Sequence, residues 1–498
     1  MTKEELIKCY EDWRFKCSAY EMALTIMNID KQTNAPSKGA EYRDPRFAYL
    51  SGEVFKLQQD EQMLHVMEDL LHFDLPCDLA KEIKLELEML AKYKAVPNDF
   101  YVQHVATCNA SFNAWLKAKK QNNYNLFKPY LEKMIENSKQ LISYRGSSQN
   151  IYEQLLNDNE SEVGIAFYDD FFSTIKEELL PFIKKVQQAK QIDDSFLHQD
   201  YAILKQKEFM AIVLKYINYT HDWGYQNESE HPFTTGICEN DLRTTTKYIS
   251  NNPISAVLST VHECGHAYYE HQVNPKYDGT ILLRSIKMGM HESQSRLLEN
   301  YLGRSENFWH FLYPKLQSIF KEQLSDIPLA DFVRAINKVE ASLVRTEADE
   351  LTYPIHILIR YELEKEIFIN NLSVDRLEDL WNEKYQAYLG VSATKASQGI
   401  LQDVHWSSGN FGYFPTYALG SAIAAQIFHR LEKEVDVQKV LVNDQFSLLT
   451  DWLKENVHQY GAALSFQELL QKCTGERFNI KYYITYLKHK FSKLYNLS

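Results

Sequence analysis

The sequence predicts an all-α, mainly helical protein whose 498 residues form a single domain, residues 1–498. Apolar side chains recur at helical spacing over most of the chain, whereas the alternation typical of half-buried strands is rare. No fixed-period repeat and no Gly/Ser-rich or Pro-rich linker divides the chain into independent units. Hydrophobic residues make up 45% and charged residues 24% of the chain, as expected for a folded protein with a large core.

The predicted helices follow one another from the amino terminus. They cover Glu4 to Ile29, Ala48 to Phe73, Phe127 to Ser143, Phe171 to Lys190, Lys315 to Leu324 and Leu329 to Leu351. The turn-rich run from Asn34 to Gly39 separates the first two helices. Irregular patches at about 221–252, 272–280 and 399–418 are rich in Gly, Pro, His, Tyr and Asn. Loops on a rigid scaffold commonly carry function, so we expect functional residues in these patches.

A further helix is predicted to begin at Pro253 and to end near Asn274. Asn252 is a favourable cap for this helix, and proline is common in a first helical turn. Apolar residues then recur at helical spacing, at Ile254, Val257, Leu258 and Val261.

This helix carries the pattern His-Glu-x-x-His, as His262, Glu263 and His266. Histidines four residues apart project from nearly the same helix face and can bind one metal ion together. Glu263 lies to the side of that pair, where it can reach a water molecule without binding the metal itself. The pattern predicts a catalytic metal site, and the alternative is a helix whose two histidines are solvated or satisfied in the core.

A catalytic zinc ion normally takes three protein ligands, so the two histidines need a partner. Glu292 is the best candidate, because the 25 residues between it and His266 accommodate a loop and a returning helix. Glu299, about two turns further along that second helix, and Glu270, one turn after His266, are rivals. A glutamate such as Glu292, taken alone, is more often an exposed helix carboxylate.

Composition excludes several classes of function. The net charge of −13 and the lack of a long basic run argue against a nucleic-acid surface. No window is long and apolar enough to span a bilayer, so we expect no membrane partner.

The cysteines and the amino terminus predict a cytoplasmic location. The seven cysteines are scattered and form no Cys-x-x-Cys pair, so neither a disulfide framework nor a thiolate zinc site is predicted. The first residues lack an apolar signal region. Cys264 is two positions from each histidine and points away from their face, which makes it a poor metal ligand.

Six segments, in this order, resemble the motifs of the carboxypeptidase Taq family of metallocarboxypeptidases. They are His231-Pro232-Phe233, Asp241-Leu242-Arg243-Thr244-Thr245, His262-Glu263-Cys264-Gly265-His266, His291-Glu292-Ser293-Gln294, Val344-Arg345-Thr346-Glu347-Ala348-Asp349 and Gly399-Ile400-Leu401-Gln402-Asp403-Val404-His405-Trp406. The likeness spans at least residues 231–420, and weaker similarity reaches both ends of the chain.

The resemblance implies an enzyme dependent on zinc or cobalt, with one ion per subunit, that releases single residues from peptide carboxyl termini with broad specificity. It also implies a homodimer and a helical body with a deep active-site cleft, similar to the neurolysin-like and angiotensin-converting-enzyme-like zincins. Residue by residue, it implies His262, His266 and Glu292 as metal ligands and Glu263 as the general base. It therefore favours Glu292 over Glu299.

A carboxypeptidase must bind a free carboxylate, and the planar fork of arginine suits that contact. Arg345 is the first candidate, and its alternative is a helix salt bridge with Asp349. Arg243 is the second candidate, and its alternative is a loop pairing with Asp241.

The tetrahedral intermediate of peptide hydrolysis needs hydrogen-bond donors besides the metal. His405 and Tyr413 are candidates, and His231 is a candidate for the same role or for substrate binding. Lone tyrosines and histidines in loops are more often structural, and the match to the family motifs is what raises His231 and His405.

The sequence also departs from the usual pattern of the family. The early tryptophan-aspartate segment reads Asn28-Ile29-Asp30, and the run before Pro232 reads Tyr225-Gln226-Asn227-Glu228-Ser229-Glu230. Arg284 and Lys287 stand in a segment that is more often small and neutral. These departures leave the chemistry intact and concern substrate preference and dimer contacts.

Two other functions fit the same residues. A metallo-endopeptidase or dipeptidyl carboxypeptidase would use the same metal centre and differ in the length of its products. A catalytically silent peptide-binding protein would keep the fold, but Glu263 and all three ligand positions are present.

Overall fold

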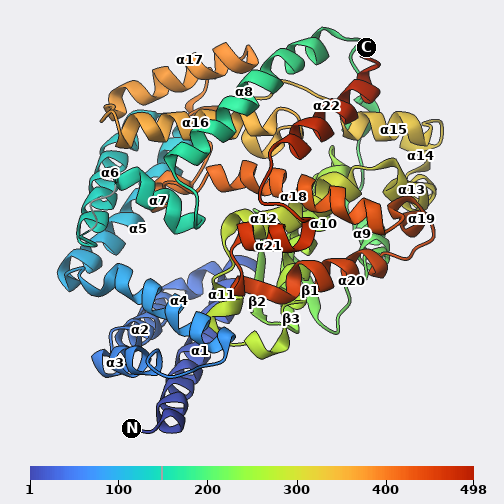
Figure 1. The fold of residues 1–498 in the computed structure, drawn as a ribbon. Coiled ribbons are helices and arrows are strands. Elements are labelled where there is room, and N and C mark those ends of the chain that lie inside the picture. The colour runs from blue at the N-terminus through green and yellow to red at the C-terminus, as the bar shows by residue number, and fades with distance from the viewer. Residues whose placement is uncertain (147–149, 498) are drawn as a thin grey trace.

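The computed structural model describes residues 1–146 and 150–497 and confirms a mainly helical fold (Figure 1). The helices before the strands are α1 (Lys3–Thr33), α2 (Ala40–Gln58), α3 (Glu61–Leu70), α4 (Cys77–Lys94), α5 (Asn98–Gln121), α6 (Lys128–Ser143), α7 (Ile151–Asn159), α8 (Ile165–Gln188) and α9 (Ile203–Tyr216). The strands are β1 (Gly224–Glu228), β2 (Thr234–Cys238) and β3 (Asp241–Thr246). The helices that follow are α10 (Pro253–His271), α11 (Ile281–Arg284), α12 (Met288–Arg296), α13 (Glu306–Ile319), α14 (Lys321–Leu324), α15 (Leu329–Ile336), α16 (Tyr353–Phe368), α17 (Leu377–Leu389), α18 (Pro415–Glu434), α19 (Val437–Val442), α20 (Ser447–Asn456), α21 (Phe466–Thr474) and α22 (Lys481–Tyr495).

Three of the predicted helices are interrupted or shortened in the structure. The helix predicted from Ala48 to Phe73 is two helices, because Asp60 caps α3 by accepting from the backbone N–H of Gln62 at 3.0 Å. The helix predicted from Lys315 to Leu324 is interrupted at Phe320, which has non-helical backbone angles.

The helix predicted from Leu329 to Leu351 ends at Ile336 instead. There the amide of Asn337 donates to the carbonyl oxygens of Val333 and Arg304, at 2.9 Å each. The side chain of Asn337 thus competes with continued helix formation, as such short polar side chains commonly do.

The patch at 221–252, predicted to be irregular, contains a small sheet of order β1-β3-β2. β1 pairs with β3 in parallel and β2 pairs with β3 antiparallel. The strands are short, and three consecutive threonines of β3 are buried, so apolar alternation is absent from them. The sheet packs against α10 through β2 and β3.

Within residues 1–146 and 150–497, buried apolar side chains form two separate clusters. The larger cluster fills the body of the molecule from α5 to α22. The smaller one lies among α1, α3 and α4 and includes Tyr10, Trp13 and Met67. Figure 1 shows these first helices at one end of the molecule, below the body.

Helices α10, α12 and α18 are packed closely at the centre of the body, and two glycines permit this. A Cβ added to Gly265 on α10 would lie 2.5 Å from the backbone of Gln294 and Ser295 on α12. A Cβ added to Gly420 on α18 would lie 2.8 Å from the side chain of Glu292. The helix that carries Glu292 is therefore held between two others.

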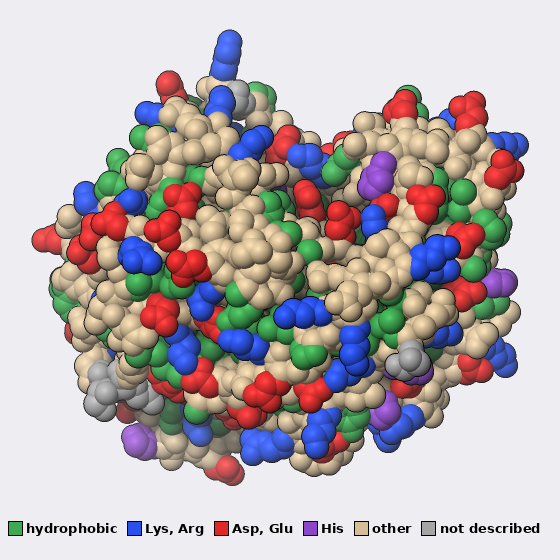
Figure 2. Space-filling model, turned by 90° about the horizontal axis from the view of Figure 1, so that it is seen from above, with side chains coloured by type: hydrophobic (Ala, Val, Ile, Leu, Met, Phe, Trp, Pro, Cys, Tyr) green, Lys and Arg blue, Asp and Glu red, His purple; other side chains and the backbone are tan. Residues whose placement is uncertain are grey.

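The surface carries mixed charge. On the face drawn in Figure 2, acidic and basic side chains are interspersed, and the upper edge of that face is notched. Among the described residues, no helix is both long and apolar enough to cross a membrane.

Candidate metal centre

Helix α10 presents both predicted histidine ligands. The side chain of Asn252 caps the helix by accepting from the backbone N–H of Ser255 at 3.2 Å, and Pro253 occupies the first turn, as predicted. The helix ends at His271, close to the predicted end. The rings of His262 and His266 lie one turn apart with centroids separated by 5.0 Å.

Helix α12 brings Glu292 to the two histidines. Its Oε2 atom lies 3.4 Å from Nε2 of His266 and 3.8 Å from Nε2 of His262. Its other oxygen, Oε1, accepts from Nε of Arg296 at 2.7 Å. The carboxylate therefore keeps one oxygen for the histidines and uses the other to anchor itself.

The ligand atoms of His262, His266 and Glu292 all lie within 4.8 Å of one another. Two imidazole nitrogens and one carboxylate oxygen are a donor set that suits a divalent metal with an open coordination position. Burial would raise the pKa of Glu292, but Arg296 and the two histidines outweigh it and hold that pKa well below its ordinary value. Burial lowers the pKa of His266 to about 3, with a further contribution from His291. Both groups thus favour the deprotonated forms that bind metal ions.

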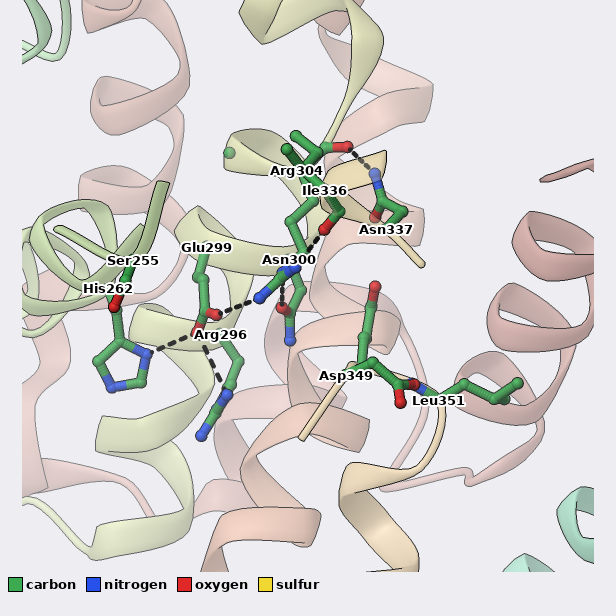
Figure 3. Close-up of polar contacts among 12 residues, drawn as sticks. Ser255, His262, Arg296, Glu299, Asn300, Arg304, Ile336, Asn337, Asp349 and Leu351 are labelled. Carbon is green, nitrogen blue, oxygen red and sulfur yellow. Dashed lines mark hydrogen bonds and ion pairs between the residues drawn. The ribbon is translucent and has the colours of Figure 1, made fainter. Parts of the chain in front are cut away.

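A layer of charged side chains orients His262. Its Nδ1 lies 2.9 Å from Oε2 of Glu299, and Figure 3 shows this carboxylate between the imidazole and two arginines. Arg296 donates to Oε2 of Glu299 at 3.2 Å, and Arg304 donates to Oε1 at 3.2 Å. Arg304 is anchored in turn by donating to the carbonyl oxygen of Ile336 at 2.7 Å. A carboxylate on the second ring nitrogen fixes the orientation of a histidine ligand.

Glu299 reaches His262 from a π-helical turn, η5 (Leu297–Gly303), that continues α12. In an α-helix, residues five apart point in different directions, whereas the wider π-helical turn brings them together. This winding accounts for the pairing of Glu299 with Arg304. As a result, Glu299 contacts Nδ1 of His262, whereas Glu292 faces Nε2 of both histidines. The sequence had predicted one uniform helix here.

Glu263 lies beside the ligand pair without joining it. Its Oε2 accepts from the hydroxyl of Thr234 at 2.7 Å, and the same hydroxyl is 2.9 Å from its backbone oxygen. Burial raises the pKa of Glu263 above its ordinary value, against the opposing effect of His262. Strand β2 thus holds the carboxylate of Glu263 in place through Thr234.

The two rival ligands, Glu299 and Glu270, lie outside the group formed by His262, His266 and Glu292. Glu299 contacts Nδ1 of His262, the nitrogen that faces away from Glu292. Glu270 pairs with Nε2 of His291 at 3.0 Å, and the His291 ring stacks on that of His266 with centroids 4.5 Å apart.

Arg345 belongs to a buried ion-pair cluster rather than to a helix salt bridge. It begins a 3-10 turn, η6 (Arg345–Glu347). Its Nε and Nη2 lie 3.0 and 2.9 Å from Oδ1 of Asp403, while Arg360 contacts the other oxygen of Asp403 at 2.7 Å. Asp349 instead accepts from the hydroxyl of Thr352 and nearby backbone N–H groups. The predicted alternative of an Arg345–Asp349 pair is therefore wrong.

The remaining nitrogen of Arg345 links this cluster to the metal centre. Nη1 donates to the hydroxyl of Tyr353 at 3.2 Å. The guanidinium of Arg296 lies over the ring of Tyr353, 4.3 Å from its centroid, and Arg296 anchors Glu292. Tyr353 thus joins the two charged clusters.

His405 and Tyr413 lie together in the 399–418 patch. His405 is in the 3-10 turn η9 (His405–Ser408), its ring centroid is 5.4 Å from that of Tyr413, and its Nε2 is 3.1 Å from the hydroxyl of Tyr417. Burial lowers the pKa of His405 to about 3, and Arg345 adds to the effect. Burial and the charge of Glu292 raise the pKa of Tyr413. Tyr413 is therefore a neutral phenol close to Glu292.

Arg243 and His231 have other partners. Arg243 on β3 donates through Nε and Nη2 to the two oxygens of Asp241, at 2.9 Å each, which is the alternative considered for it. The side chain of His231 is exposed, and its carbonyl oxygen accepts from Ser229.

Sequence reasoning missed Thr234, Arg296, Tyr353 and Tyr417. Thr234 and Arg296 lie within two residues of motifs found in the sequence, and this position could have indicated a role for both. Tyr353 lies in α16, which is buried on nearly every side, so its local pattern gives no signal. Tyr417 lies in the 399–418 patch, where functional residues were expected, but no motif singled it out.

A helical body, a His-Glu-x-x-His helix and a glutamate from a second helix define a metallopeptidase of the zincin class. Comparison with known proteins agrees. The family model of the carboxypeptidase Taq (M32) metallopeptidases matches residues 11–491. The chain therefore belongs to this family, and it is a metal-dependent carboxypeptidase.

Relatives cover nearly the whole chain. Carboxypeptidase 1 of Bacillus subtilis is 39% identical over 486 residues, which are 97% of each chain. Thermostable carboxypeptidase 1 of Thermus thermophilus is 32% identical over 94% of each chain. The solved M32 carboxypeptidase from Deinococcus radiodurans superposes with a TM-score of 0.95 at 30% identity, over 100% of each chain.

Proposed function

We propose that this carboxypeptidase uses one zinc ion per chain, held by His262, His266 and Glu292, and releases single residues from peptides with broad specificity. The observation that carries the proposal is the convergence of two imidazoles and one carboxylate oxygen within 4.8 Å, with Glu263 beside them. The two-histidine, one-glutamate set is typical of catalytic zinc in peptidases, and cobalt is the alternative ion.

Glu263 acts as the general base and then as the general acid. The bound ion supplies a Lewis acid at the scissile carbonyl and lowers the pKa of water. Glu263 takes a proton from the attacking water and delivers it to the leaving amine. Two features support this role: burial raises the pKa of Glu263, and the hydrogen bond from Thr234 holds its carboxylate beside the proposed ligands.

Tyr413 and His405 stabilise the developing oxyanion. The raised pKa of Tyr413 keeps its hydroxyl protonated, as a hydrogen-bond donor must be. His405 is neutral, and its Nε2 lies 3.1 Å from the hydroxyl of Tyr417. This nitrogen can therefore either accept a hydrogen bond from Tyr417 or donate one to it.

Arg345 contributes a single N–H to the carboxylate of the substrate. Its Nε and Nη2 are directed at Asp403, so Nη1 is the nitrogen free to exchange Tyr353 for a ligand. Arg243 and His231 are further substrate contacts under this proposal. A substrate carboxylate at Arg243 competes with Asp241 for the same fork.

We also propose a cytoplasmic homodimer without nucleic-acid or membrane partners. Seven free cysteines support a reducing compartment, because secreted proteins commonly oxidise theirs. Analytical ultracentrifugation tests the oligomeric state: a sedimenting species of twice the chain mass is expected, and a concentration-independent monomer contradicts the dimer.

Mass spectrometry of peptide products tests the activity. The protein is stripped of metal, reloaded with zinc or cobalt, and incubated with a short peptide. A ladder of single-residue losses from the carboxyl terminus is expected, restored only by metal and blocked by amidating that terminus. Released dipeptides or internal fragments that ignore amidation contradict the proposed exopeptidase action.

A further inference from the structure

Helix α12 has only nine residues, and the contacts of these residues with neighbouring elements determine the position of Glu292. The close contacts at Gly265 and Gly420 fix its distance from α10 and α18. The carboxyl end of α12 continues directly into η5, so the amino-terminal end is the one that needs a restraint of its own. Each residue of slip moves a helical side chain by about 1.5 Å and turns it by about 100°.

The amino-terminal end of α12 lacks a cap from its own sequence. Lys287 occupies the cap position with extended backbone, and its side chain makes no capping hydrogen bond. The first N–H groups of an α-helix have no partner within the helix. A buried end of this kind needs an acceptor from elsewhere in the chain.

Glu160, 129 residues earlier in the chain, supplies that acceptor. Its Oε2 accepts from the backbone N–H of Gly289 at 2.9 Å, and the N–H of Met290 also faces the carboxylate. Glu160 is fully buried, and burial raises its pKa to about 8, against the charge of Lys287 and the N–H groups of Gly289 and Met290. A carboxyl group accepts hydrogen bonds through its carbonyl oxygen whether or not its other oxygen carries a proton.

Glu160 is itself fixed in space. It ends α7, where its N–H donates to the carbonyl oxygen of Leu156 at 3.0 Å. The amide of the neighbouring Asn159 donates to the carbonyl oxygens of Leu155 and Phe411. The carboxylate approaches the helix so closely that a Cβ on Gly289 would lie 2.8 Å from Oε2 of Glu160. A larger residue at position 289 would therefore displace either the carboxyl group of Glu160 or the helix end.

We propose that Glu160 is a positioning residue for the metal site, which sets the axial position of α12 and thereby places Glu292 against His262 and His266. This inference rests on the proposed ligand set. Metal ligands tolerate displacements of only about 0.2 Å, so a small shift of α12 weakens metal binding. Groups that orient ligands from outside commonly change metal affinity 10- to 100-fold when they are removed.

Two substitutions break the contact from opposite sides. Glu160→Met removes the accepting oxygen with little change in volume, and the methyl group added by Gly289→Ala pushes the helix end and the carboxyl group of Glu160 apart. Glu82→Met is the matched control, because Glu82 is also a buried glutamate, bonded to Tyr10 and Arg14 in the separate amino-terminal cluster.

The readouts are the zinc dissociation constant, from competition with a chromophoric chelator, and the visible absorption spectrum of the cobalt-loaded protein. Both are measured well below the unfolding temperature. We expect Glu160→Met and Gly289→Ala to weaken zinc binding at least tenfold and to alter the cobalt bands. We expect Glu82→Met to lower the unfolding temperature without either change.

Glu292→Gln separates the two proposals. If it loses zinc while Glu160→Met and Gly289→Ala bind zinc within twofold of the parent and keep its cobalt spectrum, the positioning role is refuted. If Glu292→Gln itself retains parental affinity, the ligand assignment fails and the inference fails with it.

Discussion

The two oxygens of Glu292 have different tasks. One accepts from Arg296, and the other faces the histidines at 3.4 and 3.8 Å. The division follows from the sequence, because Arg296 lies four residues after Glu292 on the same helix face. The anchored carboxylate stays ionised and cannot rotate freely. A single fixed oxygen is what a third metal ligand requires.

Replacing Glu263 with Gln tests the general base. The amide keeps the shape of the side chain but cannot take a proton from water. Turnover is expected to fall by at least about 100-fold, the lower limit for a positioned general base. Zinc content measured by plasma mass spectrometry is expected to stay at the parental level. Parental turnover in the variant contradicts the assignment.

Replacing Glu299 with Ala tests the carboxylate that orients His262. The substitution frees Nδ1 of His262 and leaves Arg296 and Arg304 without their shared partner. Zinc affinity is expected to fall about 10- to 100-fold, as for other carboxylates bonded to histidine ligands. Chelator competition measures this fall, with Glu340→Ala at an exposed site as the control. Equal affinity in the two variants contradicts the orienting role.

Among single residues, the sequence predicted that His262, His266 and Glu292 lie together and missed most of their surroundings. His262 and His266 were predictable because helical spacing alone puts them on one face. Tyr353 lies 57 residues and Tyr417 121 residues after Arg296, and no local spacing connects residues so distant. The alternative partner of Arg345 was mispredicted for a related reason: a helix was assumed across 345–349, where the chain forms a 3-10 turn.

On the scale of elements, the contact between α10 and α12 leaves no room for a side chain at Gly265. The added methyl group of Gly265→Ala meets backbone atoms of α12 at 2.5 Å, and backbone cannot move aside as a flexible side chain does. We expect a loss of about 1–3 kcal/mol in the free energy of unfolding, as for other overpacked cores.

Denaturant unfolding measures this loss, and Gly52→Ala is the matched control. Gly52 lies inside α2 with nothing within 4 Å of an added Cβ. The control is expected to gain about 0.5–1 kcal/mol, because alanine favours helix interiors over glycine. A neutral or stabilising Gly265→Ala contradicts the close packing.

The strands and the π-helical turn were beyond sequence prediction for physical reasons. The strands total few residues, and β3 buries threonines, whose polar side chains hide the pattern of a half-buried strand. The turn at Leu297–Gly303 has the same apolar content as an α-helix. Its wider winding brings Glu299 to His262 and Arg304, contacts that only the folded structure reveals.

On the scale of the whole molecule, the amino-terminal helices have their own apolar cluster and meet the body partly through ions. Arg284 on α11, one of the unusual residues of this sequence, contacts Glu21 on α1 and Glu86 on α4. Lys92 on α4 lies 2.7 Å from Asp158 in the body. A single continuous domain remains a prediction, because these contacts join two clusters without merging them.

Glu86 makes the attachment dependent on pH. Burial raises its pKa from 4.5 to about 7, with Glu21 and Glu82 adding to the rise and Arg284 and Arg14 opposing it. Because the folded-state pKa lies above the unfolded value, the stability that Glu86 contributes is complete below pH 4.5 and is lost as the pH rises through 7.

Glu86→Gln removes this titration. Relative to the parent, the variant is expected to gain stability between pH 4.5 and 7, by at most about 3 kcal/mol, and to gain nothing more above that range. Denaturant unfolding of both proteins at several pH values measures the difference. A difference independent of pH contradicts the raised pKa.

The most direct test of the account is the metal stoichiometry of three metal-stripped proteins titrated with zinc: the parent, Glu292→Gln and Glu270→Gln. Both substitutions neutralise one glutamate close to the histidines, but only Glu292 shares the metal-binding group with them. We expect one tightly bound zinc ion and restored peptidase activity in the parent and in Glu270→Gln, and neither in Glu292→Gln. Tight binding and activity in Glu292→Gln, with their loss in Glu270→Gln, would contradict it.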